Sequence, residues 1–189
     1  MTAKKRATKV PIYQIKVTLE DSKPPIWRRL LVRSDVTLAT LHLIIQAAMG
    51  WWDAHLHQFI VGQTYFGEPH PDYGFDMQDE KRVTLSEIAS DEGSKFRYEY
   101  DFGDGWLHQV LVEKVLPPAP GKDYPACVKG RRAGPPEDVG GVWGYDAFLE
   151  IMRDPDHPEH GDYVEWIGGE FDSEAFDLDE VNAALRSLR

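Results

Sequence analysis

Residues 95–115, KFRYEYDFGDGWLHQVLVEKV, decide the fold class of this chain. Aromatic residues take every second position of the first half and charged residues take the positions between them, which predicts a strand with one buried face. Turn-forming residues 103–105 separate this strand from a second run rich in valine and leucine. We therefore expect a β-hairpin whose aromatic face anchors it to the core. That face consists of Phe96, Tyr98, Tyr100 and Phe102.

The turn sets which residues of the hairpin face each other. A two-residue Asp-Gly turn places Asp101 opposite His108, as does a four-residue loop ending at Trp106. A three-residue bulged loop would instead place Leu107 opposite Asp101. Because a carboxylate that orients an imidazole is common in general-base and metal sites, Asp101 and His108 are candidate functional residues. In the simpler interpretation, the pair only stabilises the hairpin, by about 0.2–1 kcal/mol.

The flanking sequence predicts a sheet covered by helices. Alternating apolar and polar residues predict strands beside the hairpin at residues 10–20, 26–33 and 56–61. Capping residues and apolar stripes predict helices at residues 38–49, 84–89, 145–153, 158–167 and 178–188. Residues 65–80 and 116–142 are expected to be loops. The predicted fold class is α+β: a β-grasp-like mixed sheet of about five strands, a covering helix after the first hairpin and a C-terminal group of helices.

Composition favours one globular domain. The chain has 189 residues, 42% of them hydrophobic and 12% aromatic, which suits a single α+β domain over residues 10–189. Residues 1–9 are basic and are expected to be a flexible tail. Cys127 is the single cysteine of the chain, so no intrachain disulfide is possible and a reducing, cytoplasmic location is expected. The longest apolar run is too short to cross a bilayer, so no membrane association is expected.

Charge is distributed unevenly along the chain. The formal net charge is −11, but residues 1–33 carry +7 and the remainder carries −18. The acidic body argues against a broad nucleic-acid surface, because affinity for phosphates depends on lysine and arginine. The acidic region after Asp146 predicts a basic protein partner. A basic N-terminal arm could contact DNA, although a solvated tail is the simpler interpretation. The arm contains Lys4, Lys5, Arg6 and Lys9.

Histidines and carboxylates supply the candidate metal ligands. His55 and His57 are two residues apart, so on a strand both would point to the same face and could bind one ion. With Asp101 and His108 they would form a divalent-metal site. Three side chains of the loop at residues 116–142 could close over it. These are Cys127, Glu137 and Asp138.

Structural roles are the simpler interpretation of several of these residues. His55 would then bond to backbone near Asp53, and His57 would be half buried. Cys127 would be a small buried hydrophobe. His42, on the apolar stripe of the first helix, is expected to be a core residue with its hydrogen bonds satisfied. No cofactor is expected beyond a possible divalent metal.

Separated motifs resemble the plasmid Ri open-reading-frame-three-like family. The resemblance extends from about residue 10 to residue 188, and the motifs occur in the family's order. They are GWWDAHLHQF (50–59), YEYDFGDGWLH (98–108), CVKG (127–130), PPEDVGG (135–141), GY (144–145) and FDLDEVNAAL (176–185).

The resemblance implies a small α+β protein of bacteria or archaea, in a family whose members are often plasmid- or transposon-borne. Some members are labelled TnpR-type resolvases or insertion-element passenger proteins. The family brings no established activity, so no catalytic residue is transferred. A serine recombinase would need a serine among arginines, and the serines of this chain are scattered.

The leading functional hypothesis is a non-enzymatic binding or interaction domain associated with mobile elements. One alternative is a metal-dependent hydrolase or nuclease that uses a cluster of histidine and acidic side chains. The cluster would consist of His55, His57, Asp101 and His108, with Glu137 or Asp138. The other is a DNA-associated protein that acts through the basic arm.

Overall fold

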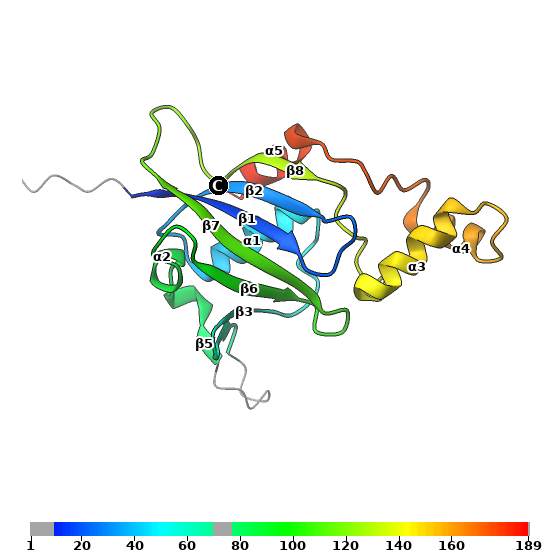
Figure 1. Ribbon diagram of the computed structural model, residues 1–189, viewed down its shortest axis with the longest axis horizontal. Coiled ribbons are helices and arrows are strands. Elements are labelled where there is room, and N and C mark those ends of the chain that lie inside the picture. Colours follow the sequence, from blue (N-terminus) through cyan, green and yellow to red (C-terminus); the bar gives the residue numbers. More distant parts are fainter. Residues whose placement is uncertain (1–9, 70–76, 189) are drawn as a thin grey trace, which may run out of the picture.

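The computed structural model describes residues 10–69 and 77–188, which form an α+β fold around one eight-stranded sheet (Figure 1). The strand order is β5-β4-β3-β6-β7-β1-β2-β8, with β4 and β5 parallel and the other neighbours antiparallel. The strands are β1 (Ile12–Leu19), β2 (Trp27–Arg33), β3 (His57–Val61), β4 (Thr64–Gly67), β5 (Met77–Asp79), β6 (Lys95–Tyr100), β7 (Trp106–Leu116) and β8 (Ala126–Arg131). The helices are α1 (Leu38–Met49), the 3-10 turn η1 (Glu80–Arg82), α2 (Leu85–Ile88), α3 (Gly141–Arg153), α4 (His160–Ile167) and α5 (Leu178–Arg186).

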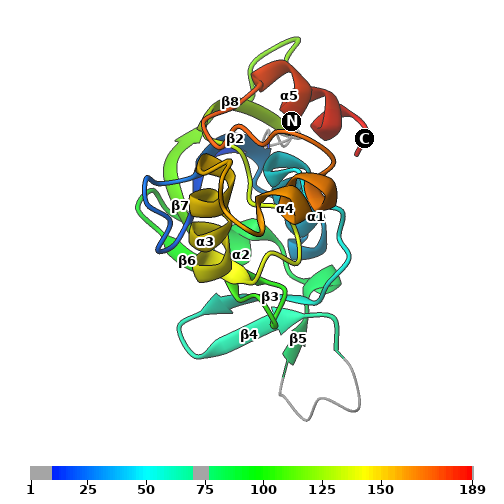
Figure 2. The same cartoon turned by 90° about the vertical axis from the view of Figure 1, so that its right-hand side faces the viewer.

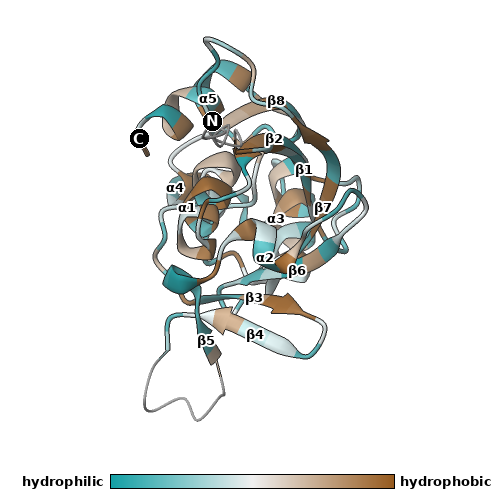
Figure 3. Cartoon of the chain, turned by 90° about the vertical axis from the view of Figure 1, so that its left-hand side faces the viewer, coloured by the Kyte–Doolittle hydropathy of each residue, from teal (hydrophilic) through white to brown (hydrophobic). Residues whose placement is uncertain are grey.

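Helix α1 covers the sheet, as the sequence predicts. Thr37 caps its first turn by accepting a hydrogen bond from the Thr40 amide, and Gly50 ends it in the left-handed conformation. Its buried leucines and isoleucines join the core formed by β1, β2, β6 and β7. Figures 2 and 3 view this arrangement from opposite sides, with the sheet on one side of α1. In Figure 3, hydrophobic residues gather on the central strands and on α1.

The central hairpin has a different register from the predicted one. His108 pairs with Tyr98 and Trp106 pairs with Tyr100, so the prediction that Asp101 faces His108 is wrong. Asp101 adopts a left-handed conformation with φ of 55°, and its carbonyl accepts a hydrogen bond from the Gly105 amide. This backbone conformation ends β6 before Asp101 and makes residues 101–105 the loop.

The end of β6 before Asp101 also places Phe102 in the loop. Because Phe102 follows the end of β6, it does not continue the alternation of Phe96, Tyr98 and Tyr100, which are buried. Its side chain is 46% exposed. The prediction that Phe102 anchors the hairpin to the core is therefore wrong.

The five-strand, β-grasp-like prediction is also wrong in detail, because three strands lie in segments expected to be loops. Strand β4 overlaps the start of residues 65–80, β5 lies within them, and β8 lies within residues 116–142. The first two are too short to show a clear alternation. Strand β8 is an edge strand whose pairing with β2 is interrupted by a register shift, which also hides the two-residue period.

All three predicted C-terminal helices are present, but they lie in two places: α3 packs on α4, and α5 packs on α1 and β8. Helix α5 packs beside β8, where the Asn182 side chain both accepts from the Cys127 amide and donates to the Cys127 carbonyl. Helices α3 and α4 extend to the side of the sheet (Figure 1). None of the helices in the described ranges is long and apolar enough to span a bilayer. The basic tail predicted at residues 1–9 lies outside the described residues.

Candidate functional site

A cavity of about 1030 Å³ opens between α1 and the strands at the β3–β4–β5 end of the sheet. This volume is at the upper end of the range for small-molecule sites. Among the described residues that line it, four carboxylates face one lysine, so the lining has a formal charge of −3. These residues are Asp53, Glu68, Glu80, Glu99 and Lys81. Three histidines, His42, His55 and His57, also line the cavity.

His42 belongs to a closed hydrogen-bond network on the cavity wall. Gln46 donates to the Tyr98 hydroxyl, which can donate in turn to His42 Nδ1 at 2.8 Å. This leaves His42 Nε2–H to donate to Asp53 Oδ1 at 2.7 Å. Burial lowers the pKa of His42 to about 4, so the ring is neutral at pH 7. The prediction that His42 is a satisfied core residue is confirmed.

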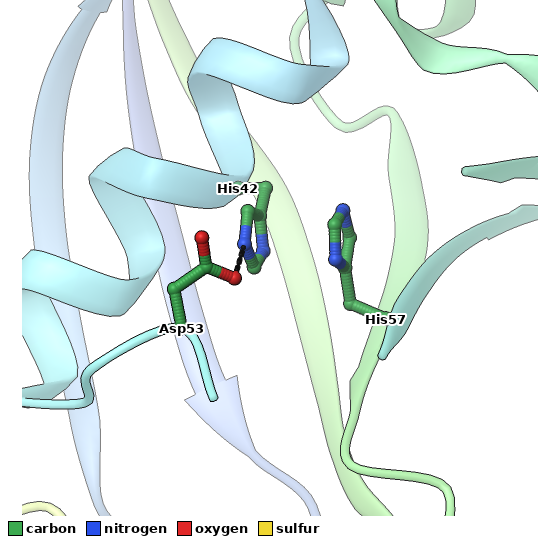
Figure 4. A group of neighbouring side chains, drawn as sticks. All are labelled: His42, Asp53 and His57. Atoms are coloured by element: carbon green, nitrogen blue, oxygen red, sulfur yellow. Dashed lines mark hydrogen bonds and ion pairs between the residues drawn. The ribbon is translucent and has the colours of Figure 1, made fainter. Parts of the chain in front are cut away.

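His57 stacks on His42. The two ring centroids are 3.4 Å apart and the planes differ by 4° (Figure 4). On its other side, His57 Nε2 is 2.8 Å from Glu80 Oε2. The pair and Asp53 have ligand atoms close enough together to suggest a metal site. However, a metal ion binds about 2 Å from a ring nitrogen and in the plane of the ring. Parallel rings at this separation cannot both bind one ion, so we interpret the pair as part of a hydrogen-bond network.

His55 belongs to a separate group at the rim of the cavity. Its Nε2 atom is 3.1 Å from Asp138 Oδ1 and 3.7 Å from Asp101 Oδ2. The expectation that His55 and His57 share one face of a strand is wrong, because β3 begins at His57. The structure therefore separates the predicted metal ligands: His57 is in the first group, His55 and Asp101 are in the second, and His108 is in neither.

The loop of residues 135–141 brings Asp138 to this group. The Glu137 carboxylate accepts hydrogen bonds from the Trp52 amide and the Tyr100 hydroxyl, both at 2.9 Å. The Trp51 indole donates to the Pro135 carbonyl, and the Gly140 amide donates to Asp104 in the hairpin loop. The loop therefore covers the turn of the hairpin. The hydrogen bonds of Glu137 hold the loop against Trp52 and Tyr100, and the next residue, Asp138, faces His55.

Two other candidates lie apart from both groups. His108 is fully buried, with its ring against Trp51 and its Nδ1 atom 3.0 Å from the Trp106 carbonyl oxygen. Burial lowers the pKa of His108 to about 4. Cys127 lies on β8 and is 4% exposed, and burial raises the pKa of its thiol. The interpretation of Cys127 as a small buried hydrophobe is confirmed.

Sequence reasoning missed Asp53 and Glu80 as cavity residues. Asp53 is in the same motif as His55 and His57, which was a usable signal. Glu80 gave no such signal, because it is the last residue of a segment expected to be a loop, and only the folded chain brings its carboxylate to His57.

The fold and the site together define a class: an α+β protein with an acidic, histidine-lined cavity at one end of an eight-stranded sheet. The chain belongs to the family described as "Plasmid pRiA4b ORF-3-like protein", whose family model matches residues 11–180. The family resemblance seen in the sequence is thus confirmed.

Two similar proteins extend this finding. The chain is 40% identical over 179 residues to "Uncharacterized protein y4hQ" of Sinorhizobium fredii (strain NBRC 101917 / NGR234), covering 94% of this chain and 92% of that protein. It also matches a crystal structure of a protein of unknown function, MM3350 from Methanosarcina mazei Go1. The TM-score is 0.83 and the identity 39%, over 92% of this chain and 98% of that one. Neither description names an activity, so the site is the basis for a functional proposal.

Proposed function

We propose that this protein is a non-enzymatic binding domain whose cavity takes a cationic group, an ammonium or guanidinium carried on an apolar stem. The observation that carries the proposal is the formal charge of −3 on the described lining of a cavity of about 1030 Å³. The cation can belong to a free amine or to a lysine or arginine side chain of a basic partner.

The lysine already counted in this charge neutralises one carboxylate, and the other three have no lysine or arginine partner among the described residues. Lys81 pairs with Glu68 at 2.7 Å. The neighbour of Asp53 is His42, which is neutral at pH 7 because its pKa is lowered to about 4. Glu99 accepts a hydrogen bond from the uncharged amide of Gln58. Carboxylates that share a cavity repel one another, and a cation bound among them would relieve this repulsion.

Apolar and aromatic side chains complete the site. Tyr65 and Phe102 line the cavity and are 42% and 46% exposed, so their ring faces are available to a ligand. An aromatic face attracts a cation through its quadrupole. Leu43 and Leu56 also line the cavity and would contact the apolar stem of the ligand.

Isothermal titration calorimetry with hexylammonium, hexan-1-ol and hexanoate tests the proposal, in EDTA to remove metal ions. We expect hexylammonium to bind with the highest affinity and hexanoate not to bind. Glu99→Gln should weaken hexylammonium binding by about tenfold, equivalent to ~1.4 kcal/mol. Glu170→Gln, a substitution outside the cavity lining, is the matched control and should leave the affinity unchanged. Equal affinity for the alcohol and the amine would disprove the role of charge.

A second candidate function is metal-dependent hydrolysis, favoured by the His55, Asp101 and Asp138 group at the rim. Three protein ligands leave coordination positions open for water, as in catalytic metal sites. The nuclease version of this function is disfavoured, because the carboxylates of the cavity would repel a phosphodiester backbone.

The acidic helical region supports binding of a basic protein partner. From Asp146 to Glu180 the chain has many carboxylates and a single base, Arg153. Trp143 on α3 is 85% exposed and could contribute an aromatic contact. DNA binding through the N-terminal arm concerns residues outside the described ranges.

A further inference from the structure

We propose that His55, Asp101 and Asp138 form a binding site for one divalent metal ion at the rim of the cavity. The three residues come from segments far apart in the sequence, and one ligand atom from each lies within 4.8 Å of the other two. The site adjoins the proposed cation pocket and shares His55 with it, whereas Asp101 and Asp138 are not part of the cavity lining.

The Nε2 atom of His55 is the first observation that points to an ion. This atom is buried and has no hydrogen-bond partner among the residues that the structure describes. Carboxylate oxygens lie 3.1 and 3.7 Å away, but neither meets the geometry of a hydrogen bond. A buried ring nitrogen without a partner is costly. A metal ion between it and the two oxygens would satisfy all three atoms.

The spacing of the three atoms also fits an ion. Two ligands bound at about 2.1 Å with a tetrahedral angle between them are roughly 3.4 Å apart. The observed separations of 3.1 and 3.7 Å lie on either side of this value. Asp138 is 69% exposed at its side chain, so it can adjust its position as an ion binds.

The backbone positions the two aspartates beside His55. Asp101 and Asp138 both adopt left-handed conformations, with φ of 55° and 59°. Asp101 Oδ1 accepts a hydrogen bond from the Gly103 amide, which leaves Oδ2 facing His55. The hydrogen bonds of Glu137 to Trp52 and Tyr100 hold the segment that carries Asp138. The site is therefore largely formed before an ion binds.

The ligand types favour a particular class of ion. One imidazole and two carboxylates suit Zn²⁺ or Mn²⁺, whereas sites for Ca²⁺ use oxygen ligands throughout. Three protein ligands leave further positions for water or for a donor atom of a molecule in the neighbouring cavity.

Calorimetric titration of the EDTA-treated and dialysed full chain with ZnCl₂ and MnCl₂, in the absence of any amine, tests this site. We expect one ion per chain. His55→Gln, Asp101→Asn and Asp138→Asn should each weaken binding by at least tenfold. Asparagine is chosen because it tolerates the left-handed conformation. Asp138→Asn is the most informative variant, because its exposed side chain can be changed with little effect on folding.

Three control variants distinguish this site from other possibilities. His157→Gln and Asp154→Asn alter a histidine and an aspartate on the surface, and both should bind the ion like the unmodified chain. His57→Gln removes a residue of the stacked pair and should also leave the affinity within about twofold. The proposal is overturned if neither ion binds with a Kd of 1 mM or lower, which corresponds to a binding free energy of ~4 kcal/mol. It is also overturned if His57→Gln abolishes binding while Asp138→Asn preserves it.

Discussion

At the scale of single residues, the surroundings of His42 and His108 oppose a positive charge. Both rings are buried, and the pKa of each is lowered to about 4. In the unfolded chain, histidine titrates near pH 6.5. Between these values the unfolded state binds more protons than the folded state, so stability rises with pH in this window. The contribution is complete above pH 6.5 and is lost as the pH falls toward 4.

We therefore predict that the free energy of unfolding decreases as the pH is lowered from 6.5 to 4.5. The loss should be on the order of 3 kcal/mol for each histidine if the full window is crossed. Urea denaturation at several pH values measures it. His108→Gln should be less stable at pH 7 but show a shallower dependence on pH. His160→Gln, on the surface helix α4, should keep the slope of the unmodified chain. An unchanged slope in His108→Gln would contradict this assignment.

The residues of the proposed metal site show which of its features could be predicted from the sequence. The identities of His55, Asp101 and Asp138 were visible as candidate ligands, because histidine and aspartate are the usual donors. Their convergence was not, since it depends on the conformation of Asp101 and on a loop about 35 residues further along the chain. The error at His108 has the same origin: a different loop at the hairpin moved it to the buried face.

At the scale of elements, the loop at residues 135–141 depends on close backbone contact with the hairpin turn. A β-carbon at Gly141 would lie 2.2 Å from the Asp104 carbonyl oxygen, and Gly141 has φ of 69°. Only glycine fits both the contact and the conformation.

We predict that Gly141→Ala lowers the free energy of unfolding by about 2–3 kcal/mol and loosens the loop that carries Asp138. Chemical denaturation measures the first effect, and faster amide exchange in the loop reports the second. Gly161→Ala is the matched control: its added β-carbon meets no atom within 4 Å. That variant should be as stable as the unmodified chain or up to about 1 kcal/mol more stable. Equal effects of the two substitutions would refute the close contact.

The edge of the sheet depends on one side chain of α5. Asn182 makes two hydrogen bonds of 2.9 Å with the backbone of Cys127 on β8. We predict that Asn182→Ala costs about 1–2 kcal/mol of stability, because two backbone groups lose their partner. Arg186→Ala, an exposed position on the same helix, should change stability by less than about 0.5 kcal/mol. Thermal melting of the two variants side by side checks this, and similar melting temperatures would count against the role of Asn182.

Elements with a strong period were predictable and irregular ones were not. Helix α1 has the predicted bounds, because a cap, an apolar stripe and a terminal glycine all agree. Strands β4, β5 and β8 form because neighbouring strands offer them hydrogen bonds. Their own sequences are too short or too irregular to specify a strand.

At the scale of the whole molecule, the formal net charge is −11, and carboxylates are concentrated in two regions. One is the acidic helical region after Asp146, which is at the surface and was visible in the sequence. The other is the lining of the cavity, whose four carboxylates come from four separate elements or loops and meet only in the folded chain. The lining of the cavity is the basis of the proposal that the site binds a cation.

The most direct test of that proposal is to locate a bound cation by NMR. The ¹H–¹⁵N spectrum of the protein in EDTA would be recorded during titration with hexylammonium and, separately, with hexanoate. We predict that hexylammonium shifts the amide signals of His57, Gln58 and Glu99 at the cavity and leaves those of α4 unchanged. Hexanoate should shift neither set. Shifts confined to the acidic helices, or identical shifts with the two ligands, would contradict the account.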